Sequence, residues 1–506
     1  MQSINTRPPG RLARSELRLP LLATVAAYSA ACSPLACSAT EPPRTAQDNR
    51  PQDAAAAIAN PPGDAAADEL EAPFPAEVRS VELKRSITVR MKPSRHAERY
   101  GTIAAGTRVA WKSVAVNDDC SKRWVEIEPH GWICESYLKP SRRRPHGVEL
   151  PRLQPGEIVP GVYGKVTTEN PTVFRLHDEA LLEERQIDVG SVMVRRHGGI
   201  TIEDVEYWLI DKRKREYIAS PDIRPYRPSR WRGIRLGDDT GRSLPIGFPL
   251  SRTNASHSVP IYQSARDGTK VGKVSGRSPI PILETAWPAA AGDSAQSESD
   301  HGKRIALAYR IGEDRWVLAS DMRIAVKMPP PPLTGPTERW LDLDLDQQVL
   351  VAYEGTLPVY VTLVSSGARK SPTETGIYRI WIKFSETDMS DLAGESPYSV
   401  ATVPWTQFYA KDLALHTAYW HDGFGTARSH GCTNLSPQDA RFLYFWSDPR
   451  LPPGWSMSNG TVEHPGSQIR IRSDKDPDPG FRGYAARVYE ARAARQSGRS
   501  KPDGPG

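Results

Sequence analysis

The sequence is poor in cysteine and carries little net charge for its length. Its 506 residues include five cysteines, and Cys432 is the only one in the C-terminal two-thirds of the chain. A net charge of +6 leaves no electrostatic footprint of a nucleic-acid-binding protein, so we expect no nucleic-acid partner. A single hydrophobic core stops growing near ~250–300 residues, so this length predicts several domains.

Long apolar runs are also scarce, and the one near the N-terminus is short. Residues 1–37 combine four arginines, the apolar stretch 19–27 and small residues. This pattern is typical of an export signal and is too short for a membrane span. We expect an exported protein of the periplasm or cell envelope, with a weakly hydrophobic, unstructured N-terminus as the alternative. Cys32 and Cys37 each resemble a lipoprotein cleavage site without its usual upstream leucine, so membrane anchoring through either stays open.

Residues 38–77 contain few large apolar side chains and are rich in Ala, Pro, Asp and Glu. Such a segment cannot offset the entropy lost on ordering, so it predicts a flexible tether.

Short alternating strands separated by turns begin near residue 78. Residues 78–142 resemble a bacterial SH3-type module. Residues 155–228 and 245–328 resemble weaker copies, and an Ala-, Ser-, Gly- and Asp-rich insert at 288–302 interrupts the third. Such modules often bind wall peptides or hold an enzyme at its polymer, but plain spacers would show the same pattern.

Cys120 and Cys134 flank a predicted strand inside the first module. In an exported protein this arrangement favours a disulfide, worth roughly 3 kcal/mol in the chain-entropy model. Two free thiols are the alternative, which an oxidising compartment disfavours. The pairing leaves Cys432 without a partner.

Four consecutive prolines at 329–332 mark a linker, after which a further domain is expected over residues 336–462. Its early part predicts a hairpin, because the apolar stretches 349–353 and 359–363 flank Glu354-Gly355.

Cys432 lies in the segment 429–434, Ser-His-Gly-Cys-Thr-Asn, directly before a predicted helix. Ser436 suits the N-cap, Pro437 the first helical position and Asp439 the positive end of the helix dipole. A thiol near a helix N-terminus and an imidazole favours its thiolate, which is how a protein makes a nucleophile at neutral pH. A small buried residue in a turn is the alternative for Cys432.

His416 ends an apolar run, as a histidine at the end of a strand would, and a loop with two glycines leads towards Cys432. A histidine, a spacer and Ser/Thr-His-Gly-Cys-x-Asn resemble the signature of YkuD-type L,D-transpeptidases of bacterial cell walls. The resemblance covers roughly residues 337–460, with Pro-Thr-Glu-Thr-Gly at 372–376 as a variant turn. It implies a mainly β protein with a sandwich- or barrel-like catalytic domain and a helix after the nucleophile.

The resemblance also assigns catalytic roles. Cys432 would be the nucleophile and His416 the base, oriented by the backbone carbonyl of Thr417. His430 would support the nucleophile and the oxyanion site, and it is also the rival base. The backbone N–H groups of Gly431 and Cys432 could form that oxyanion site.

Two further residues of the segment belong to the supporting set. Ser429 is part of the signature, and Asn434 either fixes the loop or is a solvated turn residue. His421 and Trp420 either line the cleft or simply pack.

The implied substrate is the tetrapeptide stem of peptidoglycan. Cys432 would attack the bond before the terminal D-alanine and form a thioester. An amine from a second stem, a D-amino acid or a protein lysine would then resolve the thioester. Water as acceptor would make the protein an L,D-carboxypeptidase, and the sequence leaves that choice open. No cofactor and no metal ion is expected.

Three other interpretations compete with this one. His416, His421, His430 and Cys432 could hold zinc, although His430 and Cys432 are close together and no second cysteine helps. A papain-like wall endopeptidase has its cysteine before its histidine, the reverse of the order here. A non-catalytic wall-binding protein with a lapsed site is the alternative of a different class.

The C-terminal residues 463–506 are polar and basic. We expect a solvated tail there, with loose contact to acidic wall polymers as its functional interpretation.

Overall fold

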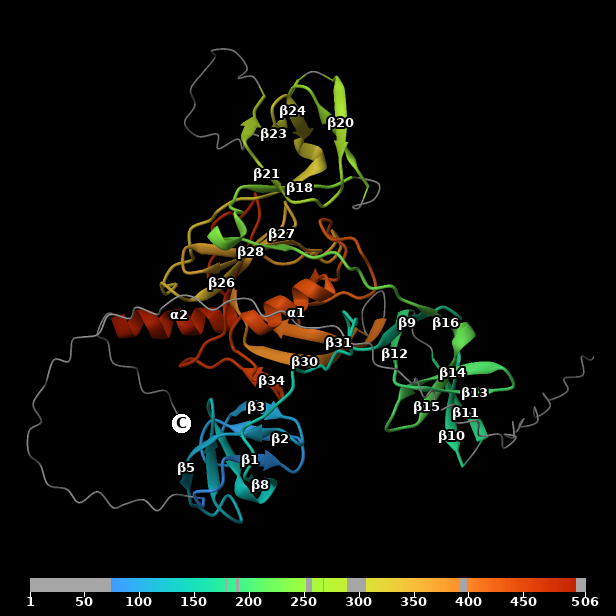
Figure 1. Cartoon of the computed structure of the whole chain (residues 1–506), viewed down its shortest axis with the longest axis vertical. Coiled ribbons are helices and arrows are strands. Elements are labelled where there is room, and N and C mark those ends of the chain that lie inside the picture. Colours follow the sequence, from blue (N-terminus) through green and yellow to red (C-terminus); the bar gives the residue numbers. More distant parts are fainter. Residues whose placement is uncertain are drawn as a thin grey trace, which may run out of the picture.

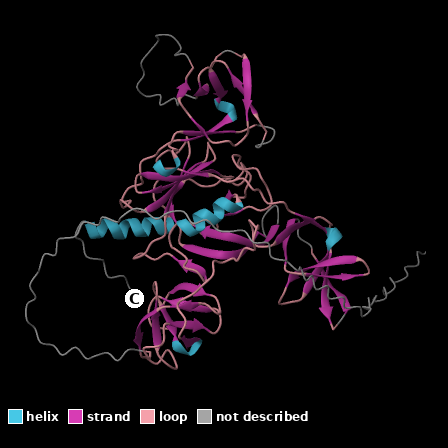
Figure 2. Cartoon of the chain, in the orientation of Figure 1, coloured by secondary structure: helices cyan, strands magenta, loops and turns pink. Residues whose placement is uncertain are grey.

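The computed structural model describes residues 74–178, 180–187, 191–251, 257–266, 268–288, 306–391 and 398–496. The expected export signal, the cysteines at 32 and 37, most of the tether and nearly all of the 288–302 insert lie outside these residues. The fold is mainly β, as predicted, with two α-helices in the described part (Figure 2). Within that part, no helix has the length and apolar character needed to cross a bilayer.

A C-terminal domain lies at the centre of the molecule, and three β units extend from it (Figure 1). The first unit contains β1 (Ser80–Leu83), β2 (Ile87–Arg90), β3 (Arg99–Ile103), β4 (Arg108–Val109), β5 (Trp111–Ala115), β6 (Trp124–Ile127), β7 (Trp132–Cys134) and β8 (Leu138–Ser141). The unit begins earlier than the predicted residue 78, because Phe74 is buried and its ring packs edge-on against Trp111. Phe74 therefore does not belong to a flexible tether.

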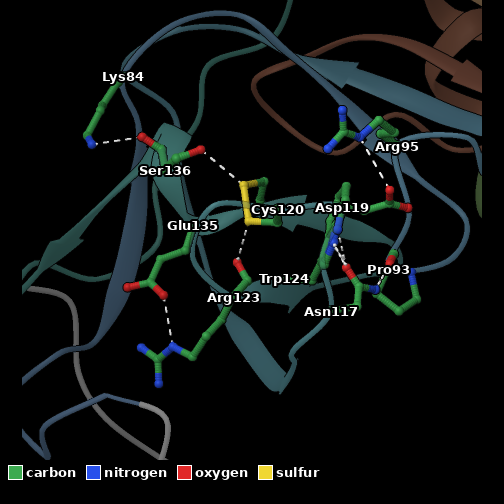
Figure 3. Close-up of a disulfide and its surroundings, with 11 residues drawn as sticks. Lys84, Pro93, Arg95, Asn117, Asp119, Cys120, Arg123, Trp124, Glu135 and Ser136 are labelled. Atoms are coloured by element: carbon green, nitrogen blue, oxygen red, sulfur yellow. Dashed lines mark hydrogen bonds and ion pairs between the residues drawn. A yellow bond between two sulfur atoms is a disulfide. The ribbon is translucent and has the colours of Figure 1, made fainter.

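Cys120 and Cys134 are joined by a disulfide in this first unit (Figure 3). Beside it, Arg123 donates to the Glu135 carboxylate at 2.8 Å. The sulfur atoms, Trp124 and neighbouring side chains form a small apolar cluster of their own.

The second unit contains β9 (Val162–Val166), β10 (Thr172–His177), β11 (Ala180–Gln186), β12 (Ser191–Arg196), β13 (Gly199–Ile202), β14 (Val205–Asp211), β15 (Glu216–Ala219) and β16 (Ile223–Pro225). The third contains β18 (Ile246–Pro249), β19 (Val259–Tyr262), β20 (Lys270–Val274), β21 (Ile280–Pro281), β22 (Glu284–Ala286), β23 (Ala308–Gly312), β24 (Arg315–Leu318) and β25 (Met322–Ala325). Between them, β17 (Ile234–Arg235) pairs with the C-terminal domain. An SH3-type relationship for any of the three units stays a prediction.

The C-terminal domain comprises β26 (Arg339–Asp344), β27 (Val349–Glu354), β28 (Leu357–Leu363), β29 (Gly376–Arg379), β30 (Ile382–Asp391), β31 (Tyr398–Phe408), β32 (Ala414–Thr417), β33 (Thr433–Leu435), α1 (Pro437–Trp446), β34 (Trp455–Asn459), β35 (Gln468–Arg472) and α2 (Gly483–Gln496). One sheet of this domain has the strand order β17-β28-β27-β26-β35-β29. In the other sheet, β30 lies between β34 and β31, β32 pairs with β31, and β33 pairs with β32. A large apolar cluster contains side chains of both sheets and of α1.

Two local predictions are confirmed. β27 and β28 form the hairpin around Glu354-Gly355, with Glu354 paired to Leu357. The helix α1 begins at Pro437, and the Ser436 hydroxyl oxygen accepts from the Asp439 N–H at 3.2 Å.

The solvated tail expected at 463–506 is wrong for two stretches. β35 lies inside the sheet, parallel to β26 and antiparallel to β29, and α2 packs on β29 with Val488 buried. The arginines of β35 are neutralised, since Arg470 and Arg472 both donate to Asp342 of β26. The domain therefore extends past the predicted boundary at residue 462.

Backbone pairing joins the C-terminal domain to two of the β units. β34 pairs with β3 of the first unit, and β31 pairs in parallel with β12 of the second. One hydrogen-bonded sheet thus runs through all three parts, which covers edges that would otherwise be exposed.

Candidate active site

Two short parallel strands, β32 and β33, bring His416 and the residue before β33, Cys432, to one cleft. β32 and β33 pair so that His416 lies beside Asn434. Cys432 directly precedes β33 and is hydrogen-bonded by the backbone N–H of Ala414 in β32. The histidine and the thiol therefore line one cleft.

His416 is buried, and its hydrogen bond fixes the state of the ring. Its Nδ1 lies 2.9 Å from the backbone carbonyl of Thr417. A carbonyl can only accept, so Nδ1 carries the proton and Nε2 keeps a free lone pair. Burial lowers the pKa of His416 to about 4, and the Thr417 carbonyl opposes this only in part. The ring is therefore a neutral base at physiological pH.

The prediction of a favoured thiolate at Cys432 is wrong for the resting site. Burial raises the pKa of the Cys432 thiol, the N–H of Ala414 lowers it, and Asp412 raises it further. Residues 433–435 form β33 between Cys432 and the helix, and a helix dipole loses its effect within about one turn. Cys432 is the free cysteine of the described residues, and it is partly exposed.

The residues before Cys432 form a tight, hydrogen-bonded loop. The Ser429 hydroxyl donates to the Cys432 carbonyl, and it accepts from the Gly431 N–H at 3.2 Å. This N–H, assigned above to an oxyanion site, is thus engaged within the loop instead. Gly431 has φ +118°, a conformation that favours glycine. The Thr373 hydroxyl donates to the Gly431 carbonyl at 2.6 Å, which fastens the loop to the 372–376 turn.

Asn434 is a buried contact residue and not a solvated turn residue. Its side-chain amide lies 3.0 Å from Nε2 of His421, whose Nδ1 accepts from the Gly423 N–H at 3.1 Å. Nδ1 therefore has no proton, and Nε2 of the neutral ring donates, which places the amide oxygen of Asn434 opposite it. Burial, with a smaller effect from Arg428, lowers the pKa of His421 to about 4.

The cleft has a volume of about 980 Å³ and draws its walls from three sources. The first is the segment 429–434, together with His416, Trp420 and His421. The second is the β30–β31 hairpin. The third is β12 of the second unit, which contributes Ser191 and Met193. His430 is exposed at the cleft, and its ring lies 5.1 Å from that of Tyr398 on β31.

Residues 338–471 match the YkuD family. The family model is that of the L,D-transpeptidase catalytic domain, and the three β units lie outside the match. The comparison with curated proteins returns no match.

Solved L,D-transpeptidases are similar to part of the chain. For L,D-transpeptidase 3 of Mycobacterium tuberculosis the identity is 18%, over 28% of this chain and 62% of that one, with a TM-score of 0.22. This chain therefore spans less than two-thirds of that protein. For the catalytic domain of the Enterococcus faecium L,D-transpeptidase the identity is 18%, over 27% of this chain and 98% of that one, with a TM-score of 0.22. For an L,D-transpeptidase from Mycobacterium smegmatis the identity is 18%, over 49% of this chain and 89% of that one, with a TM-score of 0.23.

Three of the histidine nitrogens considered as alternative zinc ligands already have hydrogen-bond partners. Nδ1 of His416 and both nitrogens of His421 are hydrogen-bonded. Across the described residues, no three His, Cys, Asp or Glu side chains converge as a metal site.

Sequence reasoning missed several residues that shape the site. Thr373 lies in the variant turn 372–376, and that turn could have indicated its role. Ser191 and Met193 gave no signal, because nothing local marks a strand of one unit as the wall of another unit's cleft.

Proposed function

We propose that the protein is a peptidoglycan L,D-transpeptidase with Cys432 as nucleophile and His416 as base. The observation that carries this proposal is the placement of a neutral imidazole and a partly exposed thiol in a single cleft. The family match supports the reaction class.

In the proposed reaction the thiol proton moves to Nε2 of His416 as the sulfur attacks the carbonyl carbon before the terminal D-alanine. The proton then passes from His416 to the departing amine, and a thioester remains on Cys432. An acceptor amine attacks the thioester and gives a proton to His416, which passes it to the departing sulfur, so the free thiol and the neutral imidazole are both restored. The hydrogen bond from Nδ1 to Thr417 keeps the ring in the tautomer that each transfer needs.

Transfer to an amine is favoured over hydrolysis by the character of the cleft. Met193, Met389, Tyr398 and Val400 contribute apolar surface to the same cleft of about 980 Å³ that Cys432 lines. Apolar walls reduce the water that could compete for the thioester. Peptidoglycan stems are the proposed partners, and export to the periplasm or cell envelope is the proposed localisation.

The decisive test incubates the protein with a disaccharide-tetrapeptide, with and without added amines, and analyses products by mass spectrometry. Wild type should release D-alanine and form amine adducts, and Cys432→Ala should do neither while keeping its circular dichroism. His416→Gln should lose roughly 10²- to 10⁴-fold in rate. D-Alanine release by Cys432→Ala at the wild-type rate would exclude the mechanism. D-Alanine release by the wild-type protein without amine adducts would establish a carboxypeptidase.

A further inference from the structure

The loop from Trp420 to Arg428 lies between β32 and the segment 429–434 that contains Cys432. Residues of the third β unit bind this loop. Asp422 in this loop accepts two hydrogen bonds of 2.7 Å from the guanidinium of Arg277. Arg277 lies between β20 and β21 of the third unit, and its side chain is only 6% exposed. A bidentate Arg–carboxylate pair fixes orientation as well as distance.

Arg277 is itself held in one geometry. Its N–H donates to the Pro249 carbonyl at 2.6 Å, and its backbone has φ +59°. Its guanidinium lies 5.5 Å from the ring of Trp231, which in turn stacks on Phe424 of the loop. A left-handed backbone at a non-glycine residue persists only where its surroundings over-determine it.

Partial burial disfavours the charge on Asp422, but hydrogen bonds from Arg277 and Ser229 outweigh it and hold the pKa of Asp422 below its ordinary range. Ser229 belongs to the segment that joins the second and third units. The carboxylate is therefore charged and anchored from two directions at physiological pH.

Gly425 gives the third unit a second hold on the loop. Arg323 of β25 donates to the Gly425 carbonyl at 3.1 Å. A Cβ on Gly425 would come within 2.8 Å of the Leu250 side chain, so the two units are in close contact there. From the opposite side the Gly425 N–H donates to Val364 of the YkuD domain at 2.7 Å.

The clamped loop leads directly to the catalytic face. His421 precedes Asp422, and its Nε2 meets the side chain of Asn434. Asn434 lies beside His416 in the sheet and two residues after Cys432. A continuous series of contacts thus runs from Arg277 through Asp422 and His421 to Asn434, the strand partner of His416.

We propose that Arg277 is a positioning residue for the active site, and that the third β unit is a working part of the enzyme rather than a spacer. Without the clamp, His421 and Asn434 lose their fixed position against the His416–Cys432 face. This inference rests on the proposed function for its kinetic consequences, but the structural effect on Cys432 can be measured independently.

The test compares Arg277→Met with Arg310→Met in the full chain. Arg310 pairs with Glu284 on the surface of the same unit, away from the loop, so its variant controls for loss of an ion pair. For Arg277→Met we expect a roughly 10- to 100-fold fall in kcat for D-alanine release with KM within about threefold, since small displacements at a reacting centre cost rates of this order. Arg277→Lys, which keeps the charge without the fork, should be intermediate.

Iodoacetamide alkylation of Cys432 at neutral pH, followed by peptide mass mapping, gives a readout that needs no substrate. The thiol should be alkylated several-fold faster in Arg277→Met and at the wild-type rate in Arg310→Met. Asp422→Asn leaves the residues of the third unit unchanged and should give the same result as Arg277→Met. If Arg277→Met does not fold, Asp422→Asn alone tests the positioning role.

Wild-type kcat and alkylation in both Arg277→Met and Asp422→Asn would overturn the positioning role. If wild type itself releases no D-alanine, the proposed function fails. The alkylation difference then still decides whether the clamp shapes the Cys432 site.

Discussion

At the scale of single residues, burial disfavours the charged forms of both His416 and Cys432. Burial keeps His416 unprotonated, with its pKa at about 4, and burial also raises the pKa of Cys432. A group whose charged form is disfavoured by burial ionises later, so the thiolate appears only at high pH and the imidazolium only in acid. In the proposed reaction, proton transfer from Cys432 to His416 therefore accompanies the attack on the stem peptide.

The pH dependence of Cys432 alkylation tests this neutral pair. The rate should keep rising with pH through and beyond ~8.5, the ordinary value for cysteine, because the raised pKa moves thiolate formation upward. Mass mapping of the modified peptide measures it, and His416→Gln should follow the same curve. A plateau reached below neutral pH would indicate a stable thiolate–imidazolium pair and contradict the assignment.

At the scale of elements, β35 shows how a basic sequence can form the interior of a sheet. Ile469 and Ile471 are fully buried, and the alternating arginines are paired with carboxylates of β26. One side of the strand thus packs in the core, and the arginines on the other side form ion pairs with β26.

Truncating one of these isoleucines should therefore be costly. Ile469→Ala should lower the free energy of unfolding by ~2–5 kcal/mol, because it leaves a cavity in the large apolar cluster that contains Ile469. Glu490→Ala, on the exposed side of α2, should change it by no more than about 0.5 kcal/mol. Denaturant titrations of both variants measure the difference, and equal stabilities would place 468–472 outside the folded core.

At the scale of the whole molecule, the second β unit takes part in the cleft. β12 adds to the edge of β31, and Tyr163 stacks on Tyr419 with ring centroids 4.0 Å apart. Successive residues of β12 face opposite ways, so Val192 packs in the core of the second unit and Met193 lines the cleft.

Met193→Ala should accordingly raise KM for the donor peptide by several-fold and leave kcat nearly unchanged, as expected when a contact to bound substrate is lost. Val192→Ala is the matched control, which should reduce stability without changing KM. Steady-state D-alanine release gives both constants. An unchanged KM in Met193→Ala would remove the second unit from substrate binding.

The sequence by itself determined the local structure around Cys432 and the reaction class that its motif resembles. The Ser429–Asn434 segment, the helix start at Ser436 and the hairpin at Glu354-Gly355 all depend on neighbours in the chain, so short patterns are sufficient to predict them. Tertiary structure alone decided the protonation state of Cys432, the place of β35 and the clamp between Arg277 and Asp422, 145 positions apart. Burial and ion pairing depend on which distant residues meet, and no local pattern carries that information.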